Sequence, residues 1–531
     1  MTVTSYLPIL RYLSPLQVAA WLATALAVCY LVFSVRFEFR LATVAITVDA
    51  GLTLRHIQNF LNLLRSPLRQ IPGPWWARFT SLGIILEGLK GRRVFGLEKL
   101  HHKYGPIIRI GPNEVSIGDW RQLRVIYANS KAALKDSAFY HSATFVGRNN
   151  IFQMTNPVEH GARRKMSSSV YALRSITQLD PLIREKAEAL VRRLLDEAQT
   201  SPNKTADAYK LCGLFSFETI CKLAFAKEFD DALADQGALK LLQSMERSAM
   251  TLLFDGVIPF LKSTSLGTML PGAVGEAYRC HKYWEEGSRN MVDHFLAKSS
   301  ADAKFLLSPI SSGVDGFLGR KLHHEELVEE AMGYMFAGSG TTSSTLTYLL
   351  YALSLPENTS IQEQLRDEIR NIPANDMNAL RQNAFVNAVI KETFRLYPTI
   401  ISTLPRVLQG PLQIGQNLIP AGTVVGMQNW IHHRNPEVFP NPDQFLPARW
   451  LQSSEAMEGS LTPFSIGQRN CIGQNLAWEE LYIAVDALMC GGLRFRIGLE
   501  MKPEEMEMED RFNIAPRGHR LMLEVKKITF Q

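Results

Sequence analysis

The stretch Phe464-Ser-Ile-Gly-Gln-Arg-Asn-Cys-Ile-Gly473 carries the most information in this 531-residue chain. Its cysteine, Cys471, stands between Gly467 and Gly473 and two residues after Arg469. The glycines permit backbone geometries that a Cβ forbids, and they let the loop approach a flat partner closely. A helical pattern begins directly afterwards, and its N-terminal amides, together with the arginine, favour a thiolate over a thiol. We therefore interpret Cys471 as a metal ligand or a nucleophile rather than a structural cysteine.

The pattern F-x-x-G-x-R-x-C-x-G resembles the haem-binding loop of cytochrome P450 monooxygenases, and every fixed position matches. The resemblance implies that Cys471 is the axial thiolate ligand of iron in haem b, which is iron-protoporphyrin IX. It also implies that Arg469 pairs with a haem propionate, because a guanidinium suits a carboxylate. Phe464 and Gly473, the first and last positions of the pattern, are expected to contact the cofactor as well.

A second segment that matches the family is Lys391-Glu-Thr-Phe-Arg-Leu-Tyr-Pro398, and the matching segments follow one another along the chain as they do in the family. This segment places Glu392 and Arg395 on one helix face. Alone, such a pair indicates an exposed ion pair that contributes roughly a few tenths of a kcal/mol. The resemblance implies instead a buried structural network. Its third member is Arg449, and the network would hold the core behind the haem loop.

The segment Ala337-Gly-Ser-Gly-Thr-Thr342 lies inside a long helical pattern. Glycine and threonine are poor helix formers, so tight packing or a kink must accommodate them. The segment is similar to the family's [AG]-G-x-[DE]-T-[TS] motif above the haem, which implies that Gly338 borders the oxygen pocket and that Thr341 relays protons. Gly340 occupies the usual acidic position, so water, Thr341 and Thr342 would have to deliver protons.

A basic helical segment, H-G-A-R-R-K, begins at His160 and resembles the helix after the family's substrate loop. His160 and Arg164 are four residues apart, so both could face a haem propionate. Arg406, which follows a Leu-Pro pair, resembles another propionate partner. Arg163 and Lys165 fit a solvated basic face as well as they fit a positive patch that docks an acidic electron donor.

The N-terminal segment contains an uncharged stretch, Leu16–Val35. Its twenty residues would span about 30 Å as a helix, which is the thickness of a bilayer core. Two arginines follow it directly and one precedes it, so the positive-inside rule places the bulk of the chain in the cytosol. We predict a retained transmembrane helix, with a cleaved signal peptide as the alternative. The apolar stretch 41–54 could lie at the interface or form a second span.

The composition, 46% hydrophobic and 20% charged, is typical of a globular protein and excludes a disordered or disulfide-rich class. The net charge of +6 suggests a nucleic-acid or membrane partner. Residues 1–71 contain six arginines against Glu38 and Asp49, so they hold four of these charges and leave +2 for the rest. A basic nucleic-acid-binding body is therefore not expected. Six scattered cysteines without a CxxC pair favour a reducing compartment.

Pro72-Gly73-Pro74 breaks any helix, so we place a domain boundary there. Residues 1–71 are predicted to be a membrane anchor and linker, and residues 72–531 one haem-binding catalytic domain. The predicted fold is mainly α with small β-sheets, a cytochrome P450 fold preceded by an N-terminal transmembrane helix. Helices are expected over 182–198, 325–354, 361–369, 383–396 and 476–489, hairpins over 104–119 and 405–425, and a strand pair over 512–525.

The resemblance implies a haem-thiolate monooxygenase that uses O₂ and electrons from NADPH. The electron partner would be NADPH–cytochrome P450 reductase, with cytochrome b5 as an optional second donor. The location would be the endoplasmic reticulum membrane, with the catalytic domain in the cytosol. The rival interpretations are a haem-thiolate isomerase or dehydratase that acts on a hydroperoxide without a reductase, and a non-catalytic haem sensor.

The amino-acid sequences of several motifs, such as I-R-I-G-P-N-E-V-S-I and A-G-S-G-T-T, are similar to those of fungal enzymes of secondary metabolism. The expected substrate is a lipophilic polyketide, terpenoid or alkaloid, because the predicted pocket walls are mostly apolar. These walls are expected from 138–152, 250–260, 334–337, 399–404 and 513–515.

Overall fold

The computed structural model describes residues 66–129, 131–229, 234–255, 258, 260–298 and 305–528, together with 24, 49–51 and 53–55. Of the predicted span Leu16–Val35, only Thr24 falls within these residues, and it is helical. The prediction of a transmembrane helix therefore lies outside the described residues. Within the described part of the chain, no helix has both the length and the apolar character needed to cross a bilayer.

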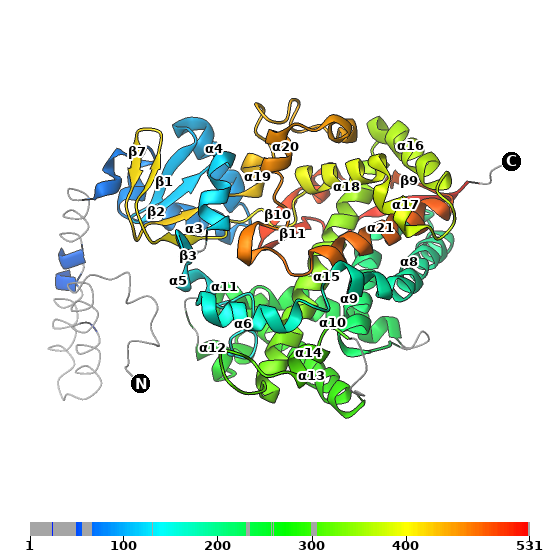
Figure 1. Cartoon of the computed structure of the whole chain (residues 1–531), viewed down its shortest axis with the longest axis horizontal. Helices are drawn as coiled ribbons and strands as arrows, with labels where there is room; N and C mark the ends of the chain where they lie inside the picture. The colour runs from blue at the N-terminus through cyan, green and yellow to red at the C-terminus, as the bar shows by residue number, and fades with distance from the viewer. Residues whose placement is uncertain are drawn as a thin grey trace.

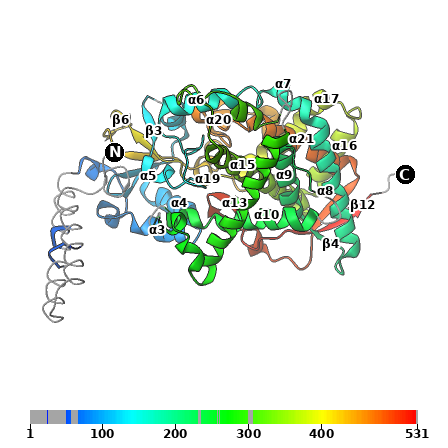
Figure 2. The ribbon, with the colours of Figure 1, turned by 90° about the horizontal axis from the view of Figure 1, so that it is seen from below.

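Helices make up most of the structure, and the five-stranded sheet lies at one end of the described part of the chain, together with α3 and α4 (Figures 1 and 2). All five helical patterns of the sequence are confirmed as α8, α15, α16, α18 and α21, within a few residues at each end. The helices are α3 (Leu82–Leu89), α4 (Arg93–Tyr104), α5 (Ser137–Tyr140), α6 (Pro157–Ser167), α7 (Leu173–Ile176), α8 (Asp180–Thr200), α9 (Ala208–Phe225), α10 (Ala234–Ser248), α11 (Thr251–Asp255), α12 (Phe260–Ser263), α13 (Gly272–Lys298), α14 (Ser308–Ser312), α15 (His324–Ser354), α16 (Thr359–Arg370), α17 (Met377–Gln382), α18 (Ala384–Leu396), α19 (Asn429–His432), α20 (Glu455–Ser460) and α21 (Gln474–Cys490).

Helix α15 runs through the centre of the helical part, and α9 packs along it. Buried side chains occur all around α15 rather than along one stripe, which is the pattern of a helix surrounded by protein. Its first turn is closed by a capping box in which His323 and Glu326 exchange hydrogen bonds with backbone groups. The central position of α15 brings the Ala337–Thr342 segment into the interior.

The strands form one five-stranded sheet and three smaller ones within the described residues. The five-stranded sheet has the order β1-β2-β8-β5-β3, in which only β2 and β8 are parallel. The predicted hairpin over 104–119 is confirmed as β1 and β2, and the hairpin-like region 405–425 contains β5, β6, β7 and β8. The strands are β1 (Ile107–Gly111), β2 (Glu114–Ile117), β3 (Ala133–Lys135), β4 (Thr205–Asp207), β5 (Arg406–Leu408), β6 (Leu412–Ile414), β7 (Asn417–Ile419), β8 (Val424–Gly426), β9 (Leu493–Ile497), β10 (Met508–Arg511), β11 (Asn513–Pro516) and β12 (Met522–Lys527).

The predicted strand pair over 512–525 is wrong. Both strands exist, but β11 pairs with β10, whereas β12 lies between β4 and β9 in another sheet. The alternation of apolar and polar residues marks a strand but not its partner. Leu523 is buried between Ala206 of β4 and Ile497 of β9, and this non-local pairing decides where β12 lies.

The packed body begins before Pro72. Leu68 and Ile71 are buried in the same apolar cluster as the strands β1 and β2. Pro72 then runs beside β1, where its carbonyl accepts a hydrogen bond from the Arg109 N–H at 2.7 Å. A Cβ on Gly73 would lie 2.3 Å from the Arg109 carbonyl oxygen, so this close approach requires glycine. Residues 66–71, which the sequence placed in the linker, therefore pack on the domain.

Glu392 and Arg395 are both fully buried on α18. The Glu392 carboxylate accepts two bonds of 2.8 Å from Arg395, one of 3.1 Å from Arg449 and one of 2.8 Å from the Trp450 indole. The remaining Arg395 donors bond the backbone carbonyls of His433, Pro442 and Gln444. The three residues of the expected network thus lie together, and a fourth, Trp450, joins them. Because all these groups are satisfied, the network holds α18 against the chain segments around it.

We expect Glu392→Gln to lower the free energy of unfolding by roughly 3–5 kcal/mol, because it leaves the Arg395 guanidinium buried without a countercharge. The matched control is Glu363→Gln, since Glu363 pairs with Arg494 at the surface. That change should cost less than about 1 kcal/mol. Denaturant midpoints of the two variants measure the difference, and equal midpoints would contradict a buried network.

Candidate functional site

A cavity of about 1260 Å³ lies between α15, the Cys471 loop and the β10–β11 hairpin. Its volume exceeds the roughly 300–1,000 Å³ of an ordinary small-molecule pocket, so it has room for more than one small molecule. Each of the five wall segments expected from the sequence contributes to it. The predicted site residues that line it are Cys471, Phe464, Gly473, Arg469, His160, Arg164, Gly338, Thr341 and Thr342.

The Cys471 loop is held by local contacts. The Cys471 N–H donates to the Phe464 carbonyl at 2.9 Å, which closes the loop. Gly467 has φ +75°, and a Cβ there would lie 2.5 Å from the Ala128 Cα, so this position requires glycine on both counts. A Cβ on Gly473 would meet only the Cys471 Sγ, at 3.8 Å. The side of the loop next to the sulfur is therefore open to the cavity.

The Cys471 side chain is exposed, and the surface that it exposes is part of the cavity wall. Burial raises the pKa of Cys471, whereas the Gly473 N–H and the positive charge of Arg164 act to lower it. The expectation that Arg469 favours the thiolate is corrected here, because Arg164 is the cation that acts on the sulfur. Arg469 instead donates to the carbonyls of Met154 and Thr155, at 2.6 and 3.1 Å.

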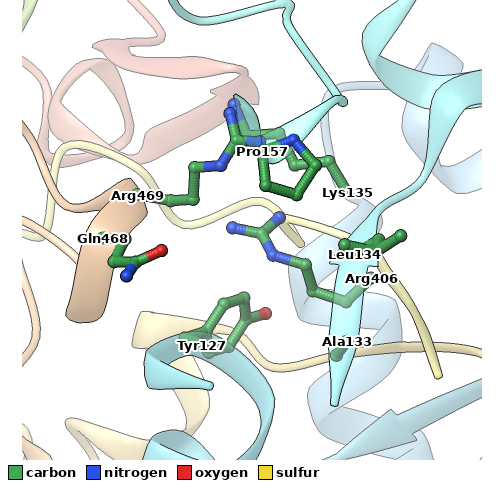
Figure 3. A pocket seen from close by; sticks show the side chains of 8 residues that line it. All are labelled: Tyr127, Ala133, Leu134, Lys135, Pro157, Arg406, Gln468 and Arg469. Atoms are coloured by element: carbon green, nitrogen blue, oxygen red, sulfur yellow. The ribbon is translucent and has the colours of Figure 1, made fainter. Parts of the chain in front are cut away.

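Three cations from distant parts of the chain meet beside the cavity: Lys135 of β3, Arg406 of β5 and Arg469 (Figure 3). Among the described residues, no carboxylate forms an ion pair with any of them. Burial and the charge of Arg406 lower the pKa of Arg469 to about 10, and the same causes lower the pKa of Lys135 strongly. Like charges gathered away from water need an anion to stabilise them. We name these three residues the cation cluster.

Helix α6 contributes two of the predicted residues to the same region. His160 is buried, and its pKa is lowered to about 3 by burial and by the charges of Arg469 and Lys135, so its ring is neutral near pH 7. Arg164 donates to the carbonyl and the side-chain oxygen of Asn470, at 2.7 and 2.6 Å, and so reaches the residue before Cys471.

The sequence offered two interpretations of Arg163, a solvated basic face and a patch that docks an electron donor, and neither is correct. Its guanidinium is buried and bonds Asp315 at 2.9 Å and also Glu330 of α15. Arg163 is therefore neither a solvated basic residue nor part of a docking patch, and it fixes α6 to α15. Of the two residues in question, only Lys165 is exposed.

The Ala337–Thr342 segment forms the α15 wall of the cavity, and the helix continues through it without a break. A Cβ on Gly338 would lie 2.7 Å from the Ile220 side chain of α9, so this glycine permits the close packing of the two helices. The Thr341 hydroxyl donates to the Ala337 carbonyl at 2.8 Å, and Thr341 is part of the cavity wall.

A buried carboxyl group that the sequence analysis missed is Glu480, on the α21 wall of the cavity. Burial raises its pKa to about 8, and the Thr342 hydroxyl next to it has the opposite, smaller effect. Glu480 is therefore mostly protonated at pH 7. One of its oxygens has no hydrogen-bond partner among the described residues. The cavity thus contains a proton-carrying group near α15 although Gly340 has no side chain.

Lys135 and Tyr140 were also missed. Tyr140 accepts a 2.8 Å hydrogen bond from Arg406 and is fully buried. A signal for Lys135 exists in the sequence: it lies two residues after Ala133 in a short strand, so the two share a face, and that face is buried. A lysine on the buried face of a strand indicates an internal anion or countercharge.

We expect Gly338→Ala to destabilise the protein by about 1–3 kcal/mol, because the added methyl group overpacks the contact with Ile220. Gly333→Ala on the same helix is the control. A Cβ there would meet only Phe145, at 3.8 Å, which is an ordinary contact. That variant should gain up to about 1 kcal/mol from helix propensity. Thermal melting of both variants checks this, and a Gly338→Ala protein as stable as Gly333→Ala would refute the packing role.

Comparisons with known proteins agree on one family. A family profile described as "Cytochrome P450" matches residues 71–520. "Cytochrome P450 monooxygenase aflV" of Aspergillus parasiticus is 30% identical over 87% of this chain and 92% of its own length. "Cytochrome P450 monooxygenase orf2" of Aspergillus niger is 27% identical over 86% and 93%. "Cytochrome P450 monooxygenase TRI4" of Fusarium sporotrichioides is 28% identical over 81% and 84%.

Among solved structures, the chain is similar to a retinoic-acid-bound cyanobacterial protein, CYP120A1. The TM-score is 0.69, and the match covers 86% of this chain and 99% of that chain. The sequence identity is 17%, so this likeness concerns the fold alone.

Proposed function

Since this chain belongs to the cytochrome P450 family and is a monooxygenase, we propose that it binds haem b through Cys471 and oxidises a lipophilic small molecule. The observation that supports this best is the open face of the Cys471 sulfur in a cavity whose edge holds the cation cluster without countercharges. Haem b has an iron that accepts a thiolate and two propionates that supply negative charge, so its chemistry fits both features.

The residues that would hold the cofactor follow from these positions. Lys135, Arg406 and Arg469 would bind the propionates, because two carboxylates would offset most of the positive charge of the cation cluster. Arg164 and His160 would border the same edge from α6. The bare Cα of Gly473 and the ring of Phe464 would lie against the cofactor near the sulfur, where a Cβ at Gly473 would protrude into the cavity.

When bound, a haem-thiolate centre supplies the chemistry that activates O₂ and transfers one oxygen atom to the substrate. The chain's own residues would position the substrate and control protons. The Thr341 hydroxyl donates to the Ala337 carbonyl and would accept a hydrogen bond from a group in the cavity. Glu480 would hold a proton at its carboxyl and pass it to the neighbouring Thr342 hydroxyl, which would release its own proton towards the cavity. This would supply protons on the α15 side of the cavity without a carboxylate at position 340.

The proposed substrate is an intermediate of a fungal secondary-metabolite pathway, such as a polyketide, terpenoid or alkaloid. The relatives named above are fungal monooxygenases, and the cavity wall away from Cys471 is rich in apolar and aromatic side chains. Electrons would come from NADPH through NADPH–cytochrome P450 reductase, with cytochrome b5 as a second donor.

We also propose that residues 1–71 anchor the enzyme to the endoplasmic reticulum through a transmembrane helix over about residues 16–35. The support is the twenty-residue uncharged stretch and the arginines that follow it. This arrangement would place the domain 72–531 on the cytosolic side.

The haem site is tested by absorption spectroscopy. The reduced full-length protein with CO should show the red-shifted band of a thiolate-ligated haem, and Cys471→Ala should abolish that band. Cys490→Ala is the control, since Cys490 is an exposed free cysteine at the end of α21. A wild-type protein without the band refutes the assignment. Turnover that needs a hydroperoxide but neither NADPH nor a reductase would favour the isomerase rival.

The anchor is tested by membrane extraction. The full chain should remain with endoplasmic reticulum membranes after an alkaline carbonate wash, whereas a chain that starts at residue 66 should be released. The glycosylation sequences at Asn203 and Asn358 should remain unmodified, because a cytosolic domain does not meet the glycosylation machinery. Release of the full chain, or glycan on either asparagine, would contradict the proposal.

A further inference from the structure

Two buried tyrosines, Tyr171 and Tyr334, line the same cavity as Cys471, and we call them the tyrosine pair. Their rings meet edge to face, with centroids 6.2 Å apart. Tyr334 belongs to α15, whereas Tyr171 precedes α7 and is tied to α21, because its carbonyl accepts a 2.9 Å hydrogen bond from Asn475. Asn475 follows Cys471 by four residues, so this bond holds Tyr171 on the side of the cavity that carries the sulfur.

Tyr334 shares one face of α15 with the residues that are expected to border the oxygen pocket. It lies four residues before Gly338 and seven before Thr341, and this spacing puts the three residues on one side of a helix. All three line the cavity. A phenol group therefore lies about one helical turn from Gly338, on the face of α15 where oxygen would be activated.

Packing alone does not account for the hydroxyl groups of the tyrosine pair. A buried tyrosine hydroxyl usually finds a hydrogen-bond partner, and a phenylalanine ring fills the same space without needing one. The Tyr334 hydroxyl bonds the Ser167 hydroxyl at 3.2 Å. The Tyr171 hydroxyl has no hydrogen-bond partner among the described residues, and it retains accessible surface on the cavity wall. A phenylalanine at position 171 would pack equally well and leave no polar group unpaired.

Both phenols keep their protons near neutral pH. Burial raises the pKa of Tyr171, and Tyr334 and the negative charge of Cys471 act in the same direction. Burial also raises the pKa of Tyr334, and Glu330 adds to this effect. A phenol that stays protonated gives up an electron together with its proton, so the tyrosine pair can supply two electrons and two protons. Conversion of one oxygen atom to water requires the same number of each.

We propose that Tyr171 and Tyr334 protect the enzyme by reducing an oxidised haem centre when no substrate is present. Each tyrosine loses one electron to the centre and one proton to the oxygen atom that would otherwise enter the substrate, and that atom leaves as water. Two phenoxyl radicals remain. Two molecules of a small thiol restore them, each by giving up one hydrogen atom, and the two sulfur atoms then form a disulfide. The inference rests on the proposed haem site and adds a substrate-independent reaction to it.

The test uses full-length, haem-loaded ferric protein, which is mixed with peroxyacetic acid without substrate and frozen rapidly. Electron paramagnetic resonance of the wild type should show a phenoxyl radical, and ring-deuterated tyrosine should narrow its signal, which identifies the radical as a tyrosyl radical. Tyr171→Phe and Tyr334→Phe should each weaken the signal, and the double variant should lose most of it. Tyr283→Phe is the matched control, since Tyr283 lies on α13 beside Lys240 and does not line the cavity.

Survival of the haem absorption band gives a second readout. Peroxyacetic acid should bleach the haem of the double variant faster than that of the wild type, and glutathione should slow bleaching of the wild type more than that of the double variant. The CO band of each reduced variant shows that its haem site is intact. The proposal is overturned by a wild type that consumes the peracid without a phenoxyl signal, or by a double variant that keeps the full signal or bleaches no faster. A wild type without the CO band counts against the haem site itself.

Discussion

The walls of the cavity are fixed to α15, and the site depends on this buried helix. At its N-terminal half, Glu329 accepts hydrogen bonds of 2.7–3.2 Å from the backbone of the 145–148 segment, while Glu330 pairs with Arg163 and so fixes α6. Further along, Gly338 admits α9 and Ser344 holds the β10–β11 hairpin. Polar groups on a helix surrounded by protein must find partners, and here those partners are the cavity walls. A shift of α15 would therefore move several sides of the site together.

The electrostatics of the site divide into two regions of opposite character. One edge gathers buried cations, and its free energy depends on an anion that the described part of the chain does not supply. The α21 wall holds Glu480, a carboxyl that burial keeps protonated, next to a threonine of α15. The first region favours binding of a negatively charged group, and the second can exchange protons. A haem monooxygenase needs both properties, at different places around one cofactor.

Much of the fold and site could be predicted because the information was local. The Cys471 loop, the Glu392–Arg395 pair and the helix of Thr341 are each continuous motifs, and helical periodicity placed the long helices correctly. What escaped prediction depends on contacts between distant segments. Lys135 meets Arg406 and Arg469 only after three separate segments have packed, and the partner of β12 is set by strands far away in sequence. Arg163 was misread because adjacent residues in a basic run face opposite environments on a helix.

The unpaired cation cluster changes what the net charge of the chain means. Of the six net positive charges, four belong to the N-terminal 71 residues and two to the rest. The two propionates of a bound haem b carry two negative charges, which would bring residues 72–531 to electrical neutrality. The loaded domain would then exert little long-range attraction on an anionic lipid headgroup or a polyanion. The attraction of the whole enzyme to a charged surface would come almost entirely from the arginines of its N-terminal segment.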